Sequence, residues 1–148
     1  MITTIALSMI LSPAYENFKI PVYNADQKNP AVMTRVSTKL PAGFTAKDFG
    51  SGEINSEDGK ITVTLLHSSA AMPNLLRNPK YMHLKDFTTI RMTNWIGFRN
   101  SNPNGEDYKL DFNRYRINFS LIAKDHEKVL ALRNALHTII DNLDFVKH

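Results

Sequence analysis

Hydrophobic and polar side chains alternate along residues 114–123, RYRINFSLIA. Ile117, Phe119 and Leu121 fall on one side of the chain, and the residues between them are polar. Strict alternation is typical of a β-strand with one face in a core and the other face outside it. The sequence therefore predicts a half-buried strand whose second face carries arginine, asparagine and serine.

The same alternation marks other segments of the chain. It is clear in residues 31–40, 60–67 and 88–99, and residues 5–11 and 18–23 predict an N-terminal hairpin. The connecting segments are rich in turn residues or lack a period, and we expect a polar loop, a long excursion and a second loop at residues 41–59, 69–87 and 101–113. The pattern predicts five or six strands in succession.

The C-terminal part of the chain has the period of an α-helix instead. Asp125 is a good N-cap for this helix. Such a stripe, about five turns long at about 3.6 residues per turn, needs an apolar surface to lie on, and the sheet offers one. The sequence therefore predicts an α+β fold, an antiparallel sheet with the amphipathic helix packed on one face. The apolar stripe comprises Val129, Leu132, Leu136, Ile139 and Leu143.

Length and composition limit the possibilities further. A chain of 148 residues has the length of one domain, and we expect a single domain over residues 1–148. The formal charge of +4 is compatible with a polyanionic partner without requiring one. The absence of cysteine excludes disulfides and thiolate metal sites. The apolar N-terminus lacks a basic flank and is shorter than the ~20 residues that span a bilayer, so we expect a soluble, unprocessed protein with no membrane partner.

The polar side chains of the central strands would lie on the face of the sheet opposite the helix, which we call the outer face. None of the four central strand segments contains aspartate or glutamate. Strands disfavour acids in any case, which is an ordinary structural explanation. A surface of unpaired cations among hydroxyls and amides also suits single-stranded RNA, whose phosphates and sugars take such contacts. The candidate RNA-binding residues are Lys60, Thr62, Thr64, Arg91, Thr93, Arg114, Arg116 and Asn118.

Two aromatic residues are candidate platforms for stacking bases, Trp95 and Tyr115. Alternation puts Tyr115 on the buried side of its strand, and Trp95 follows a break in the strand pattern. We therefore expect both side chains in the core.

No arrangement of residues predicts catalysis. The five histidines show neither metal-ligand spacing nor an HExxH pattern, and the glycines at positions 50 and 52 do not open a helix. Glu106 and Asp107 are adjacent in a predicted loop with nothing to position them. We expect no enzyme, no catalytic residue, no metal site, no cofactor and no small-molecule substrate.

The segment INFSLIAKDHEKVLALRNALHTIID, residues 117–141, is a strand, a short charged connection and a long amphipathic helix. It resembles the corresponding end of the coat proteins of single-stranded RNA bacteriophages (leviviruses), where a strand of the form V-x-F-S-F leads into an acid-capped helix. The predicted order of the preceding elements, a hairpin and several antiparallel strands, is similar as well. The match in letters is confined to this end of the chain.

The resemblance implies a capsid protein that forms a homodimer, with the sheet continued across both subunits and each helix packed over the partner's sheet. Many dimers would close into a virion shell, assembled in the cytoplasm of a bacterial host. The outer face would bind the genomic RNA, and its positions in the last strand would be Arg114, Arg116 and Asn118. The second short helix of the family would be truncated here or merged with the first.

Two other functions stay open. A non-capsid single-stranded nucleic-acid-binding protein of the whirly or OB type would also bind on a sheet face, but its assembly would stop at a dimer or tetramer. A purely structural or inhibitory viral protein with no nucleic-acid role would use the cations only to solvate its sheet. The leading hypothesis is a coat protein that assembles with itself and binds single-stranded RNA.

Overall fold

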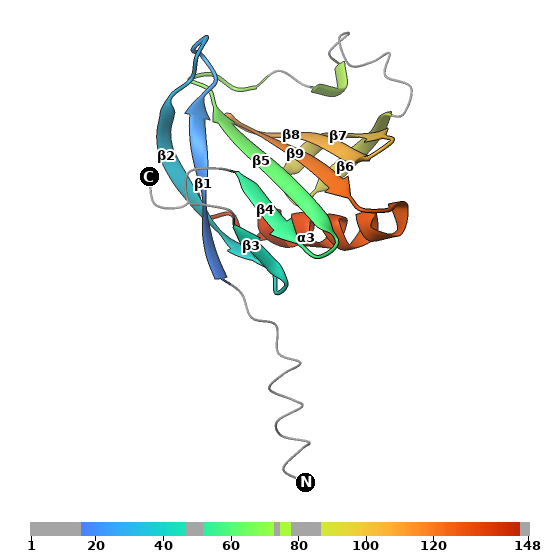
Figure 1. Ribbon diagram of the computed structural model, residues 1–148. Helices are drawn as coiled ribbons and strands as arrows, with labels where there is room; N and C mark the ends of the chain where they lie inside the picture. Colours follow the sequence, from blue (N-terminus) through green and yellow to red (C-terminus); the bar gives the residue numbers. More distant parts are fainter. Residues whose placement is uncertain (1–15, 47–51, 73–74, 78–86, 146–148) are drawn as a thin grey trace.

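The computed structural model describes residues 16–46, 52–72, 75–77 and 87–145 of the chain. These residues form an α+β fold in which one nine-stranded sheet is accompanied by a C-terminal helix (Figure 1). The strands are β1 (Glu16–Asn24), β2 (Val32–Leu40), β3 (Phe44–Ala46), β4 (Glu53–Ser56), β5 (Gly59–His67), β6 (Phe87–Met92), β7 (Trp95–Asn102), β8 (Gly105–Phe112) and β9 (Tyr115–Ala123). The helical elements are the 3₁₀ turns η1 (Leu75–Arg77) and η2 (His126–Lys128), and the helix α3 (Val129–Asp141).

The main path of the sheet has the order β2-β1-β5-β9-β8-β7-β6. Its neighbours are antiparallel except for β1 and β5, which are parallel. Strand β5 changes partner along its length: its first half pairs with β4, and its end pairs with residues 22–24 of β1. Pro21 of β1 lies directly before this last pairing begins, where its missing N–H breaks no ladder with β5.

The central strands bring their apolar residues to one face because the alternation and the register agree. Ile61, Val63 and Leu65 of β5 stand opposite Leu121, Phe119 and Ile117 of β9, and all six are buried. In Figure 1, α3 passes behind β5 and β4, and it contacts β2, β5 and β9.

Helix α3 completes the core with the stripe that the sequence predicts. Leu132, Leu136 and Ile139 are fully buried, and burying side chains of this size contributes about 1.5–3 kcal/mol each. Asp125 caps η2, which precedes the helix, through a 3.2 Å hydrogen bond from the Lys128 backbone N–H. The stripe lies on the sheet of its own chain, so the described residues bury it without a second subunit.

The α+β fold, the mostly antiparallel sheet and the C-terminal helix on one face are confirmed. The predicted number of five to six strands is wrong, because the described residues contain nine. The polar loop predicted at residues 41–59 contains β3 and β4, and the loop predicted at residues 101–113 contains β8. Among its described residues, the excursion between β5 and β6 contains the 3₁₀ turn η1.

The two ends of the fold also differ from the prediction. The strand expected at residues 5–11 lies outside the described residues, and the hairpin near the N-terminus is formed by β1 and β2. The helix is shorter than predicted, since α3 ends at Asp141. Leu143 follows it in a tail that returns to the sheet, where the Asp144 backbone N–H donates to the Ser37 carbonyl at 2.9 Å. Dimerisation stays a prediction, as does the packing of helices over a partner's sheet.

Helix α3 is too short to cross a membrane, and no other helix in the described ranges has the length and apolar character for it.

Candidate nucleic-acid interface

Most of the predicted RNA-binding residues do share the outer face of the sheet. Lys60, Thr62 and Thr64 lie on β5 at positions that alternate with its buried residues. Arg116 and Asn118 hold the matching positions on β9, where they pair with Leu66 and Thr64. Arg91 is exposed on the outer face of β6, opposite Ile96. Thr93 and Arg114 lie instead in the β6–β7 and β8–β9 turns, at the rim of the sheet.

The outer face carries acids, although the sequence predicts a face without them. The reason is β8, which pairs with β9 in the middle of the sheet and was predicted to be a loop. The register places Asp107 beside Ser120 and Asp111 beside Arg116, both on the outer face. Glu53 of β4 joins them, opposite Thr62. Four strand segments without acids therefore do not make an acid-free face, because β4 and β8 also contribute side chains to it.

Arg116 has a carboxylate partner. Its Nε donates to Asp111 Oδ1 at 2.7 Å and its Nη2 donates to Asp111 Oδ2 at 3.0 Å, a bidentate arrangement. Asp111 is only 8 % exposed, so this carboxylate relies on the arginine for its charge balance. The prediction that Arg116 stands unpaired and ready for phosphate is wrong.

Part of the outer face is covered by the chain itself. Leu75 of η1 is 2 % exposed and Phe98 of β7 is 4 % exposed, although neither belongs to the main core cluster. The Met72 backbone N–H donates to the Asn113 carbonyl at 3.0 Å, which ties Met72 to the β8–β9 turn. Leu75 and Met72 line one depression with Ile96 of the outer face. The open part of the outer face is thus centred on β5 and β9.

We call this open part the polar strip. In the described residues it contains two rows of side chains that run across the strands. Thr62 and Ser120 form one row. Thr64, Asn118 and Lys109 form the other. Lys60 lies at its end, beside a depression of about 410 Å³ that Lys124 also lines. The sequence pattern does not indicate Lys109 as a candidate, because its place on the outer face depends on the pairing of β8 with β9. The polar strip comprises Lys60, Thr62, Thr64, Lys109, Asn118 and Ser120.

The strip can do two things chemically. The Lys60 ammonium has no hydrogen-bond or ion-pair partner in the described ranges and can neutralise a phosphate. The hydroxyls of Thr62, Thr64 and Ser120 and the amide of Asn118 can donate to phosphate or sugar oxygens and to base edges. Both are properties of a binding surface, and none of these side chains is arranged for proton transfer.

A buried cluster of ion pairs lies on the other face, under the helix. Glu106 is 3 % exposed, and Arg133 of α3 donates to both of its carboxylate oxygens, at 2.6 and 2.5 Å. Arg99 Nε lies 3.2 Å from Oε2, and the Tyr108 hydroxyl donates to Oε1 at 3.3 Å. Burial alone would raise the pKa of Glu106, but the hydrogen bond and charge of Arg133 and the charge of Arg99 hold it below its usual value. Burial, and then the charge of Glu106, raise the pKa of Tyr108.

The other residues considered for catalysis, base stacking or metal binding have structural positions in the fold. Glu106 and Asp107 point to opposite faces of β8, so they do not act as a pair. Trp95 belongs to the core cluster and Tyr115 packs against it, as expected, and His67 lies against the Tyr115 ring with centroids 4.8 Å apart. No group of three or more potential metal ligands occurs in the described ranges.

Comparison with known proteins adds no assignment: no family model matches the chain, and neither a curated protein nor a solved structure matches it.

Proposed function

We propose that the protein is a viral coat protein that assembles with itself into a shell and binds single-stranded RNA through the polar strip. The observation that carries the RNA contact is the strip itself: an open stretch of sheet, opposite the helix, whose outward side chains are two lysines, three hydroxyls and an amide. The resemblance of residues 117–141 to levivirus coat proteins supports the shell. In this proposal the particle assembles in the cytoplasm of a bacterial host.

The contact surface is narrower than the sequence predicts. Lys60, Thr62, Thr64 and Asn118 remain as its centre, with Lys109 added from β8. Arg91, on the outer face of the edge strand β6, and Arg114, in the β8–β9 turn, are both exposed, and an RNA strand that continues beyond the strip would contact them. Arg116 supports the strip by neutralising Asp111 and does not bind phosphate itself.

Expression of the full chain alone in bacteria tests the shell. We expect particles far larger than a dimer, which contain host RNA that nuclease does not reach until the particles are opened. Size-exclusion chromatography and negative-stain electron microscopy measure the size, and absorbance with extraction measures the RNA. A product that stays a monomer, dimer or tetramer at every salt concentration would contradict the shell.

A second candidate function is a single-stranded nucleic-acid-binding protein that builds no shell. The packing of α3 favours it, because Leu132, Leu136 and Ile139 are fully buried on the sheet of their own chain. A fold that is complete in one chain needs no exchange of helices to be stable. Small particles with retained RNA binding would select this function.

Substitution of Lys60 tests the strip. We expect Lys60→Gln to weaken binding of a single-stranded RNA and to reduce the slope of log affinity against log salt by about 0.7, the value of one phosphate contact. Fluorescence anisotropy of a labelled RNA across a salt series measures both. Lys28→Gln is the matched control, because Lys28 is exposed in the β1–β2 turn, away from the strip.

Arg116→Gln tests whether Arg116 stabilises the fold by neutralising Asp111 or binds phosphate. It should lower the stability of the fold, since Asp111 would be left without its bidentate partner, while the salt slope measured on the folded fraction stays unchanged.

Equal slopes for the wild type and Lys60→Gln would show that RNA does not contact the strip.

A further inference from the structure

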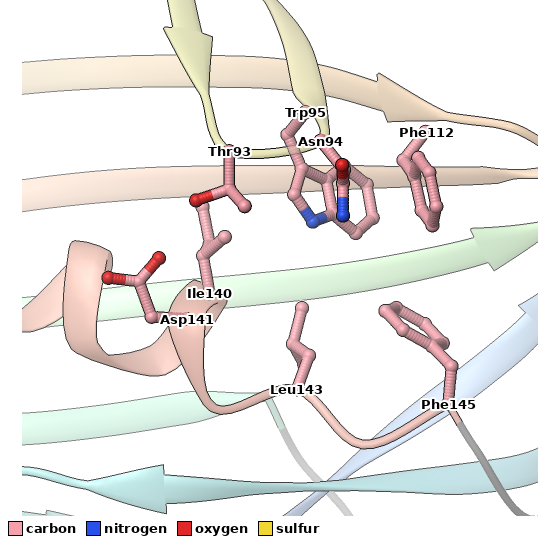
Figure 2. Close-up of a pocket in the computed structure, with 8 residues that line it drawn as sticks. All are labelled: Thr93, Asn94, Trp95, Phe112, Ile140, Asp141, Leu143 and Phe145. Carbon is pink, nitrogen blue, oxygen red and sulfur yellow. The ribbon is translucent and has the colours of Figure 1, made fainter.

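Two hollows of similar size in the described residues differ in the charge of their walls. The pocket beside Trp95 has a volume of about 330 Å³, and its one charged lining residue, Asp141, would repel an anion (Figure 2). The depression at the end of the polar strip has a volume of about 410 Å³ and is lined by Lys60, Lys124 and five uncharged residues. We call it the lysine depression. Its charge suits an anionic guest.

The register of the sheet brings the two lysines together. Lys60 of β5 pairs with Ile122 of β9, and Lys124 follows Ile122 by two residues. The Lys124 backbone N–H donates to the Asp58 carbonyl at 3.2 Å, which continues the contact of the chain beyond the end of β9. Such diagonal neighbours on antiparallel strands lie about 7–8 Å apart, within reach of long side chains. Both ammonium groups can therefore reach one small group in the depression.

Neither ammonium group is neutralised within the described residues. The side chains of Lys60 and Lys124 make no hydrogen bond or ion pair there. The acids that flank them in the sequence do not compensate their charge: Asp58 forms a 3.4 Å ion pair with the lysine of η2, Asp125 caps η2, and Glu57 does not line the depression. Like charges on neighbouring strands repel each other. A bound anion would relieve this repulsion.

The uncharged walls add a hydrogen-bond donor and an apolar surface. Asn55 of β4 pairs with Lys60, and its side-chain amide has no partner among the described residues, so it can donate to an oxygen. Ile122 is 43 % exposed and offers an aliphatic contact to a sugar or a base. Gly59 has no side chain to fill the depression, and a Cβ there would clash with the Ile122 carbonyl oxygen. These walls suit a phosphate that is attached to a nucleoside.

We propose that the lysine depression binds a phosphate group, with the ammonium groups of Lys60 and Lys124 on its oxygens and the Asn55 amide as a further donor. Lysine suits this role because its ammonium group is a compact charge with three donors. The inference rests on the proposed function, since the depression continues the polar strip and would hold a phosphate of the same RNA strand. That phosphate can be internal to the strand or at its end, where it carries a charge of about −1.5 to −2.

Lys124→Gln tests this site. In the full-length protein we expect it to weaken binding of a single-stranded RNA about threefold to tenfold at about 0.1 M salt, and to reduce the salt slope by about 0.7, the value of one phosphate contact. Fluorescence anisotropy of a labelled oligouridylate measures both. Lys124→Arg should keep most of the affinity, since it keeps the charge. Lys28→Gln removes the same charge from the exposed β1–β2 turn and should change neither quantity.

The double variant tests whether the two lysines hold the same phosphate. Once either lysine is lost the phosphate is no longer held, so the combined change of Lys60→Gln and Lys124→Gln should stay near the slope loss of one contact, about 0.7. Two separate phosphates would instead give a loss of about 1.4, the sum of two contacts.

Three strands distinguish the sources of the phosphate: one with hydroxyls at both ends, one with a 5′-phosphate and one with a 3′-phosphate. A gain in affinity from a terminal phosphate that Lys124→Gln abolishes would assign the depression to a strand end. Equal affinities of the wild type for all three, with weaker binding by Lys124→Gln, would assign it to an internal phosphate.

The proposal is overturned if Lys124→Gln keeps the wild-type affinity and slope, or if the slope losses of the two lysines add. It is also overturned if oligoglutamate competes as effectively as RNA, which would indicate an acidic protein segment as the guest. Failure of the proposed function gives a different result, because Lys60→Gln would then keep the wild-type slope as well. A lowered slope for Lys60→Gln alone would leave the polar strip in place and remove only the site at Lys124.

Discussion

Leu136→Ala is expected to lower the free energy of unfolding by about 2–5 kcal/mol, a large part of the stability of a small domain. Leu136 is fully buried in the middle of α3, among the core residues that line the sheet. Its truncation removes apolar contact area and leaves a cavity that the rigid sheet can fill only in part. Urea denaturation followed by far-UV circular dichroism measures the loss.

Leu130→Ala is the matched control, since it makes the same substitution in the same helix at a position that is 60 % exposed. We expect a change within about 0.5 kcal/mol, as for other surface substitutions. Similar losses at both positions would contradict the packing of α3 on its own sheet. A midpoint that rises with protein concentration would show that the helix is stabilised by a second subunit, as the resemblance to coat proteins implies.

The elements that the sequence predicts well are those with a clean local period. The stripe of α3 follows spacings of three and four, and β5 and β9 alternate strictly, so each element shows its buried face without knowledge of its neighbours. The packing of the helix on the sheet follows because each has one apolar face that must be buried against another element. The α+β fold could therefore be predicted from local patterns alone.

Strand β8 could not be predicted in this way. It contains three acids and a lysine, it begins with Gly105, and Asn and Pro precede it, all of which are typical of loops. Its alternation is nevertheless regular, with Glu106, Tyr108 and Leu110 on the helix side. Glu106 obscured the pattern because a carboxylate does not occupy a core position unless distant residues neutralise it.

Because β8 was predicted to be a loop, the prediction that Arg116 is unpaired was also wrong. The pair of Asp111 and Arg116 forms across the β8–β9 hairpin, and only the register reveals that the two residues are neighbours. A pocket of about 330 Å³ beside Trp95 is also invisible in the sequence, because its walls come from the β6–β7 turn, the end of β8 and the tail after α3. Sites assembled from several elements depend on pairings that no single segment encodes.

Glu106→Gln is expected to lower the free energy of unfolding by about 2–4 kcal/mol, slightly less than the usual cost of breaking a buried ion pair. The cost is large because Arg133 and Arg99 lose their shared counter-charge under the helix. It is reduced because their side chains are 33 % and 23 % exposed, so water can solvate both guanidinium groups. The amide also keeps the shape of the carboxylate and one acceptor oxygen.

The same residue makes stability depend on pH in a defined direction. The pKa of Glu106 in the folded protein is held below its ordinary value of 4.5. The folded state therefore binds the proton more weakly than the unfolded state, and the stabilisation is complete above that ordinary value. It is lost as the pH falls through the lowered pKa of the folded protein.

Chemical denaturation of the wild type and Glu106→Gln at a series of acidic pH values tests both statements. We expect the two stabilities to converge as the pH falls below 4.5, since protonation of Glu106 removes the charge that the substitution also removes. Glu57→Gln is the control, because Glu57 is exposed in the β4–β5 turn, and its curve should follow the wild type. A constant difference between the wild type and Glu106→Gln at every pH would mean that the loss comes from packing and not from the charge. The two arginines would then hold the helix to β8 without needing an anion between them.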